Sequence, residues 1–278
     1  MTPLKLNELV KGVEQRNEMW FSTNNAAISY PDAGNDECLT IEDDSFWFKH
    51  RNRCIISVVN HFSPGKVFWD IGGGNGYVSM GLQNAGIETI LVEPGENGAL
   101  NAQRRGIKNV ICSTLENIEV VPDVIEAAGM FDVIEHIEDD VEFMQKTAKP
   151  MRKGAMVYVT VPALGSLWSG DDIYAGHYRR YNLKMLEETF LKSGFEPVYS
   201  TYLFMLFPIP VTLMRRIPYL LRINGPSNAP EKMKREHSKE NPDNRGPIAA
   251  TLKWELNRVN QLKKMPVGTT CLMIGRKK

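Results

Sequence analysis

Short apolar runs alternate with amphipathic segments from residue 67 onward, and this alternation predicts strands separated by helices. The runs with the length and composition of buried strands are residues 67–71, 88–93, 108–112, 123–128 and 155–161. Helices are expected between them, with ends at Gly86 and Gly106, over 137–148, and from Asn182 to Gly194. Strands that alternate with helices predict a doubly wound, mostly parallel α/β sheet.

The two ends of the chain add to this core. Residues 1–62 predict a mainly helical extension, with an apolar face in its second half. Residues 195–204 and 269–278 have strand patterns and are expected to pair at one sheet edge. These patterns divide the chain into four segments: a helical extension or lid (1–62), a core (63–204), an apolar and basic insertion (205–264) and a final strand (265–278).

The composition is that of an ordinary folded protein with an uneven charge distribution. The 278 residues are 42% hydrophobic, and 33 Lys and Arg balance 33 Asp and Glu, so the whole chain has no bulk attraction to nucleic acid. Residues 205–278 hold 15 basic and 5 acidic residues, a net charge of +10, and residues 1–204 carry −10. Four scattered cysteines predict neither disulfides nor a metal site, and the N-terminus lacks a signal-peptide pattern, so a cytoplasmic location is expected.

A glycine-rich turn follows the first core strand in "VFWDIGGGNGYVS", residues 67–79. Asp70 precedes Gly72, Gly73, Gly74 and Gly76. Glycines between a strand and a helix let a ligand approach the main chain. The dinucleotide spacing would need a further glycine at position 77 or 79, which the chain lacks, so an NAD site is disfavoured. A carboxylate before the glycines suits a ligand with amines and positive charge; the alternative is a tight turn without a ligand.

Glu93 ends the second core strand in "LVEPG". A carboxylate at this position can accept hydrogen bonds from both hydroxyls of a ribose. The alternative is a solvated strand end, but the distance from the glycine turn favours the ribose role.

The motifs "DIGGGNG", "VEPG", "FDVIEHIEDD" (131–140) and "MRKGAMVYVTVPA" (151–163) together resemble the class I S-adenosylmethionine (SAM)-dependent methyltransferases, which have a seven-stranded doubly wound sheet. The resemblance covers residues 46–194 and the final strand. It implies that the glycines pass the methionine part of SAM, that Asp70 orients it, and that Glu93 with Pro94 holds the ribose.

The resemblance also implies an adenine contact after the third strand, where the family often has an acidic residue. This chain departs from that pattern, and the expected contacts are Ser113, Thr114 or the backbone of Leu115. The segment "SFWFKHRNR" (45–53) is similar to the family's N-terminal helix, which covers the cofactor as a lid. The alternative is an ordinary amphipathic core helix.

Two histidines are candidate bases for methyl transfer to oxygen. His136 follows the fourth strand, where a short helix start with Asp132 and Glu135 at capping-box spacing is the alternative. His177 lies in the loop 167–182, which contains an H-x-R-R-Y run that related methyltransferases share. The expected substrate contacts in this loop are Trp168, Asp172, Arg180 and Tyr181, with Arg180 as an anion clamp. A rigid loop held by its own hydrogen bonds is the alternative.

The stretch 202–223 is the most apolar of the chain, with no charged residue from Pro197 to Met214. Prolines at 208 and 210 argue against a membrane span. Arg215, Arg216 and Arg222, with the basic residues beyond them, suit peripheral contact of residues 205–235 with the inner face of an anionic membrane. A cap over the substrate pocket or a dimer face is the alternative.

These observations predict a SAM-dependent methyltransferase that acts on a small molecule, by O-methylation of a glycan, lipid or quinone-type precursor. A SAM-binding regulatory or scaffold protein without turnover is the alternative. A nucleic-acid methyltransferase is disfavoured, because the body is acidic and the chain has no Asn-Pro-Pro-Tyr or Pro-Cys type motif.

Overall fold

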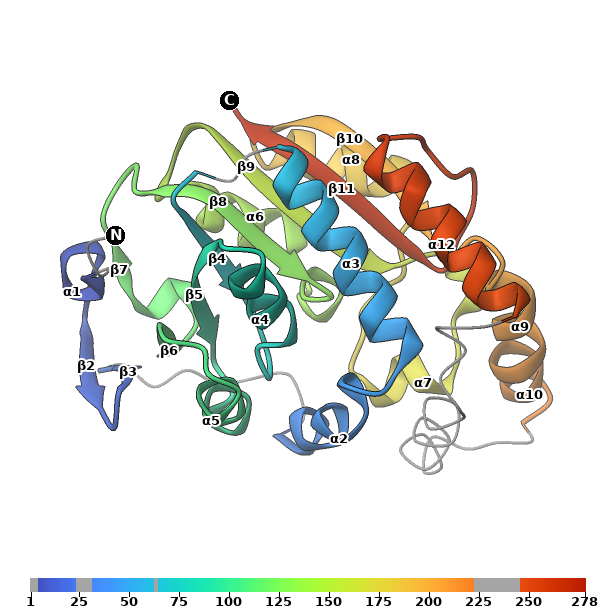
Figure 1. The fold of residues 1–278 in the computed structure, drawn as a ribbon, viewed down its shortest axis with the longest axis horizontal. Coiled ribbons are helices and arrows are strands. Elements are labelled where there is room, and N and C mark those ends of the chain that lie inside the picture. The colour runs from blue at the N-terminus through green and yellow to red at the C-terminus, as the bar shows by residue number, and fades with distance from the viewer. Residues whose placement is uncertain (1–4, 24–31, 63–64, 223–245) are drawn as a thin grey trace.

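A computed structural model describes residues 5–23, 32–62, 65–222 and 246–278. Its centre is a nine-stranded sheet with the order β10-β11-β9-β8-β4-β5-β6-β3-β2 (Figure 1). The strands of this sheet are β2 Val13–Arg16, β3 Met19–Ser22, β4 Val67–Ile71, β5 Glu88–Glu93, β6 Val110–Cys112, β8 Ile125–Phe131, β9 Met151–Pro162, β10 Phe195–Leu203 and β11 Thr270–Lys277. Two short strands, β1 Val10–Lys11 and β7 Glu119–Val120, form a separate antiparallel pair.

The predicted α/β core is confirmed. Strands β4, β5, β6, β8 and β9 run parallel to one another, because helical or irregular crossovers connect them. The predicted edge pairing is also confirmed: β11 lies antiparallel between β9 and β10. The carboxyl ends of the parallel strands therefore share one edge, where ligand sites of open α/β sheets lie.

Helices cover both faces of the sheet. Cys54, Val58 and Leu82 belong to the core cluster of one face, and Met144 and Phe190 belong to the cluster of the other. In Figure 1, α3 and α12 run side by side over the first face. The helices are α1 Leu6–Leu9, α2 Asp32–Glu42, α3 Phe46–His61, α4 Tyr77–Asn84, α5 Glu96–Arg104, α6 Asp140–Ala148, α7 Gly170–Tyr174, α8 Leu183–Lys192, α9 Pro208–Val211, α10 Ile217–Leu220 and α12 Pro247–Asn260.

The N-terminal segment is helical over α2 and α3, but its first part differs from the expected helical extension. Residues 13–22 form a hairpin that adds β3 parallel to β6 and extends the sheet by two strands. Arg16 pairs with Met19, so the loop is Asn17–Glu18, and both residues have positive φ (48° and 65°). A two-residue hairpin turn requires such φ values, which usually call for glycine. No glycine at this turn indicated the hairpin in advance.

The insertion before the last strand contributes to the core. Glu255 on α12 is buried and accepts hydrogen bonds from the backbone N–H groups of Phe204 (2.7 Å) and Met205 (2.9 Å). Its carboxylate also lies 2.8 Å from Nε2 of His50 on α3. Buried charges are stable only when paired in this way, so α12 is fixed to the body. In the part of the chain that the structure describes, none of the helices is both long and apolar enough to cross a bilayer.

Candidate active site

The glycine turn between β4 and α4 is shaped by left-handed backbone and close packing. Gly72, Gly74 and Gly76 have φ of +70°, +52° and +76°. A Cβ at Gly72 would lie 2.7 Å from Val133, and one at Gly73 would lie 2.7 Å from Leu91. At Gly74 it would meet only Oδ1 of Asn35, at 3.6 Å. Gly74 is therefore the point where the bare main chain has room for a ligand.

Glu93 faces this turn, as its proposed role requires. Oε2 accepts the backbone N–H of Gly74 at 2.9 Å, and Oε1 accepts that of Gly95 at 2.8 Å. Burial raises the pKa of Glu93, and the two backbone hydrogen bonds offset part of this effect. Each carboxylate oxygen has two acceptor sites, so both can also receive a ribose hydroxyl.

Helix α2 covers the turn from outside. The backbone oxygen of Asn35 accepts a hydrogen bond from Nδ2 of Asn75 (2.7 Å), and Arg105 bonds both to the backbone oxygen of Asn75 (3.0 Å) and to Glu42 (2.9 Å). The Asn35 side chain also hydrogen-bonds to Glu93. The carboxylate thus accommodates a donor beyond its two backbone bonds, and ribose binding requires Asn35 to share it or to move.

Asp70 is buried at the end of β4 and accepts a 2.7 Å hydrogen bond from the Ser79 hydroxyl. Burial raises the pKa of Asp70 to about 6, although the hydrogen bond and the charge of Arg51 oppose the rise. A buried carboxylate of this kind is stabilised by a cationic ligand.

The segment after β6 lies beside Glu93, because Cys112 pairs with Glu93 and the Ser113 N–H donates to the Glu93 backbone oxygen at 3.1 Å. The Ser113 hydroxyl donates to the backbone oxygen of Thr114. Leu115 packs its side chain into the core, so only its backbone is available to a ligand, in line with the expected role.

Helix α3 is a buried core helix that also reaches the site. Ser45 caps its start, and Cys54 and Ile55 pack into the core. Arg51 forms a 2.7 Å ion pair with Asp132 at the end of β8 and lies 5.4 Å from the Trp47 ring centroid. Asn52 donates to the backbone oxygen of Tyr77, so α3 contacts the end of the glycine turn, which the preceding helix α2 also covers. The role of residues 45–53 as a lid over the cofactor stays a prediction.

The two candidate bases lie together. The ring centroids of His136 and His177 are 4.7 Å apart, although they come from different loops. Oδ1 of Asp172 accepts a 2.9 Å hydrogen bond from Nδ1 of His177. This bond places the proton on Nδ1 and leaves the lone pair on Nε2. Burial, with the neighbouring His177, lowers the pKa of His136 to about 4, so His136 is neutral at physiological pH.

Asp172 and Arg180 are positioning residues in this structure. Asp172 is buried, closes a capping box with Ser169 at the start of α7, and accepts a 2.7 Å hydrogen bond from Nε of Arg180. Burial opposes its ionisation, but His177 and Arg180 lower the pKa of Asp172 overall. Arg180 also donates to the Ala163 backbone oxygen. These bonds hold the guanidinium of Arg180 against Asp172 and the Ala163 backbone oxygen, and its role as an anion clamp stays a prediction.

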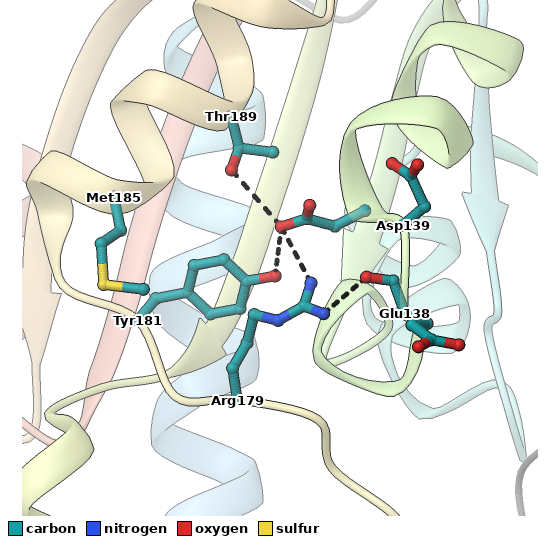
Figure 2. A pocket seen from close by; sticks show the side chains of 7 residues that line it. Glu138, Asp139, Arg179, Tyr181, Met185 and Thr189 are labelled. Atoms are coloured by element: carbon teal, nitrogen blue, oxygen red, sulfur yellow. Dashed lines mark hydrogen bonds and ion pairs between the residues drawn. The ribbon is translucent and has the colours of Figure 1, made fainter.

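Tyr181 and Trp168 differ in exposure. Tyr181 is buried, and its hydroxyl donates to Asp140 on α6 at 2.6 Å. Asp140 also pairs with Arg179 (3.4 Å) and accepts a 3.4 Å hydrogen bond from Thr189. Figure 2 shows Tyr181, Arg179 and Thr189 in the pocket that these residues line. These contacts satisfy the hydrogen-bonding groups of the four side chains and fix the loop 167–182 to α6 and α8. Trp168 is half-buried, and its backbone oxygen accepts a 2.6 Å hydrogen bond from Arg216.

Glu135 was absent from the sequence-based candidates. Its side chain is fully buried, and within the described part of the chain neither carboxylate oxygen receives a hydrogen bond of normal geometry. Burial and the nearby Asp132 raise the pKa of Glu135 well above its usual range. Asn35 and Arg51 were also missed, because their partners are distant in sequence. The only available signal for Glu135 was its place beside His136.

Comparison with known proteins places this geometry in a family. A family model for the methyltransferase domain matches residues 47–200, which is more than half of the chain. The chain belongs to this methyltransferase family, and its cofactor is SAM. No curated protein matches the sequence.

Solved structures share the fold at low sequence identity. A SAM-dependent methyltransferase from Thermotoga maritima aligns with a TM-score of 0.53 and 17% identity, over 88% of this chain and 96% of that chain. The methyltransferase structure with the Trm112 activator from Haloferax volcanii aligns at 0.59 and 13%, over 90% and 99%. A phosphoethanolamine N-methyltransferase from Haemonchus contortus, with SAM, aligns at 0.55 and 19%, over 90% of this chain and 58% of that one.

The residues present fit SAM. The turn offers bare backbone at Gly74, Glu93 offers acceptors for two hydroxyls, and Asp70 offers a buried negative charge. Gly74 would lie against the methionine part of SAM, Glu93 would bind the ribose hydroxyls, and Asp70 would face the positive charge of the cofactor.

Proposed function

We propose that this methyltransferase acts on an oxygen atom of a small-molecule acceptor, of the glycan, lipid or quinone-precursor type. SAM supplies an electrophilic methyl group on a cationic sulfur. The protein must then hold the acceptor hydroxyl in line and take its proton.

The observation that carries this proposal is the orientation of His177. Asp172 holds Nδ1, so Nε2 is the free acceptor of a proton, and His136 lies beside it as a neutral ring. As the new O–C bond forms and the methyl carbon leaves sulfur, the hydroxyl proton moves to Nε2 of His177. The Asp172 carboxylate stabilises the resulting imidazolium.

The test is methyl transfer from radiolabelled SAM to a panel of glycosides, hydroxylated lipids and hydroquinones, with the methylated atom located by NMR. His177→Asn should lower kcat by about 10²–10⁴ fold and leave the Kd for SAM unchanged. His61→Asn, an exposed histidine on α3, is the control. Methylation at carbon or nitrogen, or full turnover by His177→Asn, would contradict the proposal.

We also propose that the insertion contacts an anionic membrane surface. Six large apolar side chains of residues 206–221 are more than half exposed: Leu206, Ile209, Leu213, Met214, Leu220 and Leu221. Such density is characteristic of interaction surfaces. Arg215 pairs with Asp171, and Arg216 donates to the Trp168 backbone oxygen, so both arginines also bond within the protein. The expected contacts at 223–235 lie outside the described residues.

Vesicle flotation tests this surface. Wild-type protein should float with phosphatidylserine-containing vesicles more than with neutral ones, and Ile209→Gln with Leu213→Gln should abolish the effect. Leu191→Gln, an exposed leucine on α8, should not. Equal flotation of all variants would refute the proposal.

A further inference from the structure

Three potential metal ligands lie close together where the acceptor hydroxyl is proposed to bind. Glu135, His136 and His177 each offer one donor atom, and these atoms all lie within 4.8 Å of one another. Two come from the segment after β8 and one from the loop after β9. Ligands of one tetrahedral cation with bonds of about 2.1 Å lie about 3.4 Å apart. The donor atoms, now within 4.8 Å of one another, therefore need to approach by up to about 1.4 Å to hold a cation.

Glu135 is the second, independent observation. A fully buried carboxylate without hydrogen-bond partners is costly, because its charge is removed from water without compensation. Its side chain is 0% exposed, and neither oxygen receives a hydrogen bond within the described residues. A cation at the cluster would supply the missing partner.

The neighbouring groups prepare the ligands. Asp172 accepts a hydrogen bond from Nδ1 of His177, so Nε2 is the nitrogen that can bind a metal. Carboxylates orient metal-bound histidines in the same way. The cations nearby are already paired, Arg51 with Asp132 and Arg180 with Asp172, which limits their repulsion of a bound metal.

We propose that Glu135, His136 and His177 form a site for a divalent transition metal such as Zn²⁺. Two imidazoles and one carboxylate suit Zn²⁺, Co²⁺, Mn²⁺ or Fe²⁺ better than Mg²⁺ or Ca²⁺, which prefer oxygen ligands. Three protein ligands leave positions open for an acceptor. This departs from the expectation of no metal.

The inference rests on the proposed function, and it changes how the acceptor is activated. A cation held by these residues would make a coordinated hydroxyl lose its proton to solvent more readily, and the oxygen would bond to the methyl carbon as the carbon–sulfur bond of SAM breaks and S-adenosylhomocysteine leaves. With a metal bound, His177 would serve as a ligand, and the cation would take over the activation that His177 performs as a base in the metal-free enzyme. The geometry favours an acceptor with a second oxygen beside the methylated hydroxyl, because both can occupy open positions.

The experiment is a titration of chelator-treated full-length protein with Zn²⁺ by calorimetry and with Co²⁺ by visible absorption. Wild type should bind one equivalent. Glu135→Gln should weaken binding at least 100-fold, and Glu138→Gln, an exposed neighbour, should bind as wild type. Because Glu135→Gln removes a buried unpaired charge, the metal-free variant should unfold at the same temperature as wild type or higher. Asp172→Asn should weaken binding about 10–100-fold.

The same preparations are titrated with SAM. SAM binding without metal binding, or equal metal affinity in Glu135→Gln and wild type, overturns the metal site and leaves the proposed function standing. Stoichiometric metal binding that depends on Glu135 supports the site. Metal binding without any SAM binding would instead refute the proposed function.

Discussion

Replacement of Glu93 by glutamine tests the cofactor site most directly. The wild-type carboxylate accepts two backbone hydrogen bonds, from Gly74 at 2.9 Å and from Gly95 at 2.8 Å, with one oxygen for each. Glutamine has the same shape but only one acceptor oxygen, so its NH₂ group must face one of the two backbone N–H groups. The position is 7% exposed, so water cannot compensate fully.

The expected size of the effect follows from the bonds lost. A hydrogen bond to a charged group contributes about 1.5–3 kcal/mol. Glutamine loses the hydrogen bond to one ribose hydroxyl, and its hydrogen bond to the other hydroxyl no longer involves a charged group. The free energy of SAM binding should therefore become less favourable by about 2–3 kcal/mol. At about 1.4 kcal/mol for each tenfold change, the Kd for SAM should rise about 30- to 150-fold.

Isothermal titration with SAM measures this change, and thermal unfolding of the same samples checks that each variant is folded. Glu96→Gln is the matched control, because Glu96 is exposed in the first turn of α5. If folded Glu93→Gln binds SAM within about twofold of wild type, the assignment of Glu93 to the ribose is wrong.

Three further predictions concern buried charges and the glycine turn. Because the pKa of Asp70 is raised to about 6, the stability that its protonated form contributes is present at low pH and is lost as the pH rises through about 6. The free energy of unfolding of Asp70→Asn, relative to that of the wild type, should therefore rise by about 2 kcal/mol from pH 4 to pH 8. Urea unfolding of the SAM-free proteins measures it, and a difference that does not change with pH would contradict the prediction. Gly76→Ala should cost about 2–4 kcal/mol, from strain at φ +76° and contacts at 2.9 and 3.0 Å, whereas Gly86→Ala, at φ +84° with no atom within 4 Å, should cost only about 1–2 kcal/mol in the same assay. Glu255→Gln should lower stability by about 3 kcal/mol, since it breaks the buried pair with His50, and a loss below about 1 kcal/mol in thermal unfolding would refute that role.

The local sequence determined the core of the fold and the cofactor turn. The five central strands lie where the apolar runs predicted them, because a buried parallel strand must be continuously apolar. The glycines at 72, 74 and 76 and the carboxylates at 70 and 93 were also identified, since the turn requires positive φ and both carboxylates end adjacent strands. These signals are local in sequence.

Tertiary structure alone decided which polar groups meet. The hairpin at 13–22 was missed because its turn uses Asn17 and Glu18 where glycine is the usual signal. Asp172 accepts a hydrogen bond from Arg180, and the buried Glu135 lies close to two histidines from separate loops. Whether a polar side chain is buried, and which group it pairs with, depends on segments far apart in the chain. The spacing of residues along the sequence does not predict such contacts.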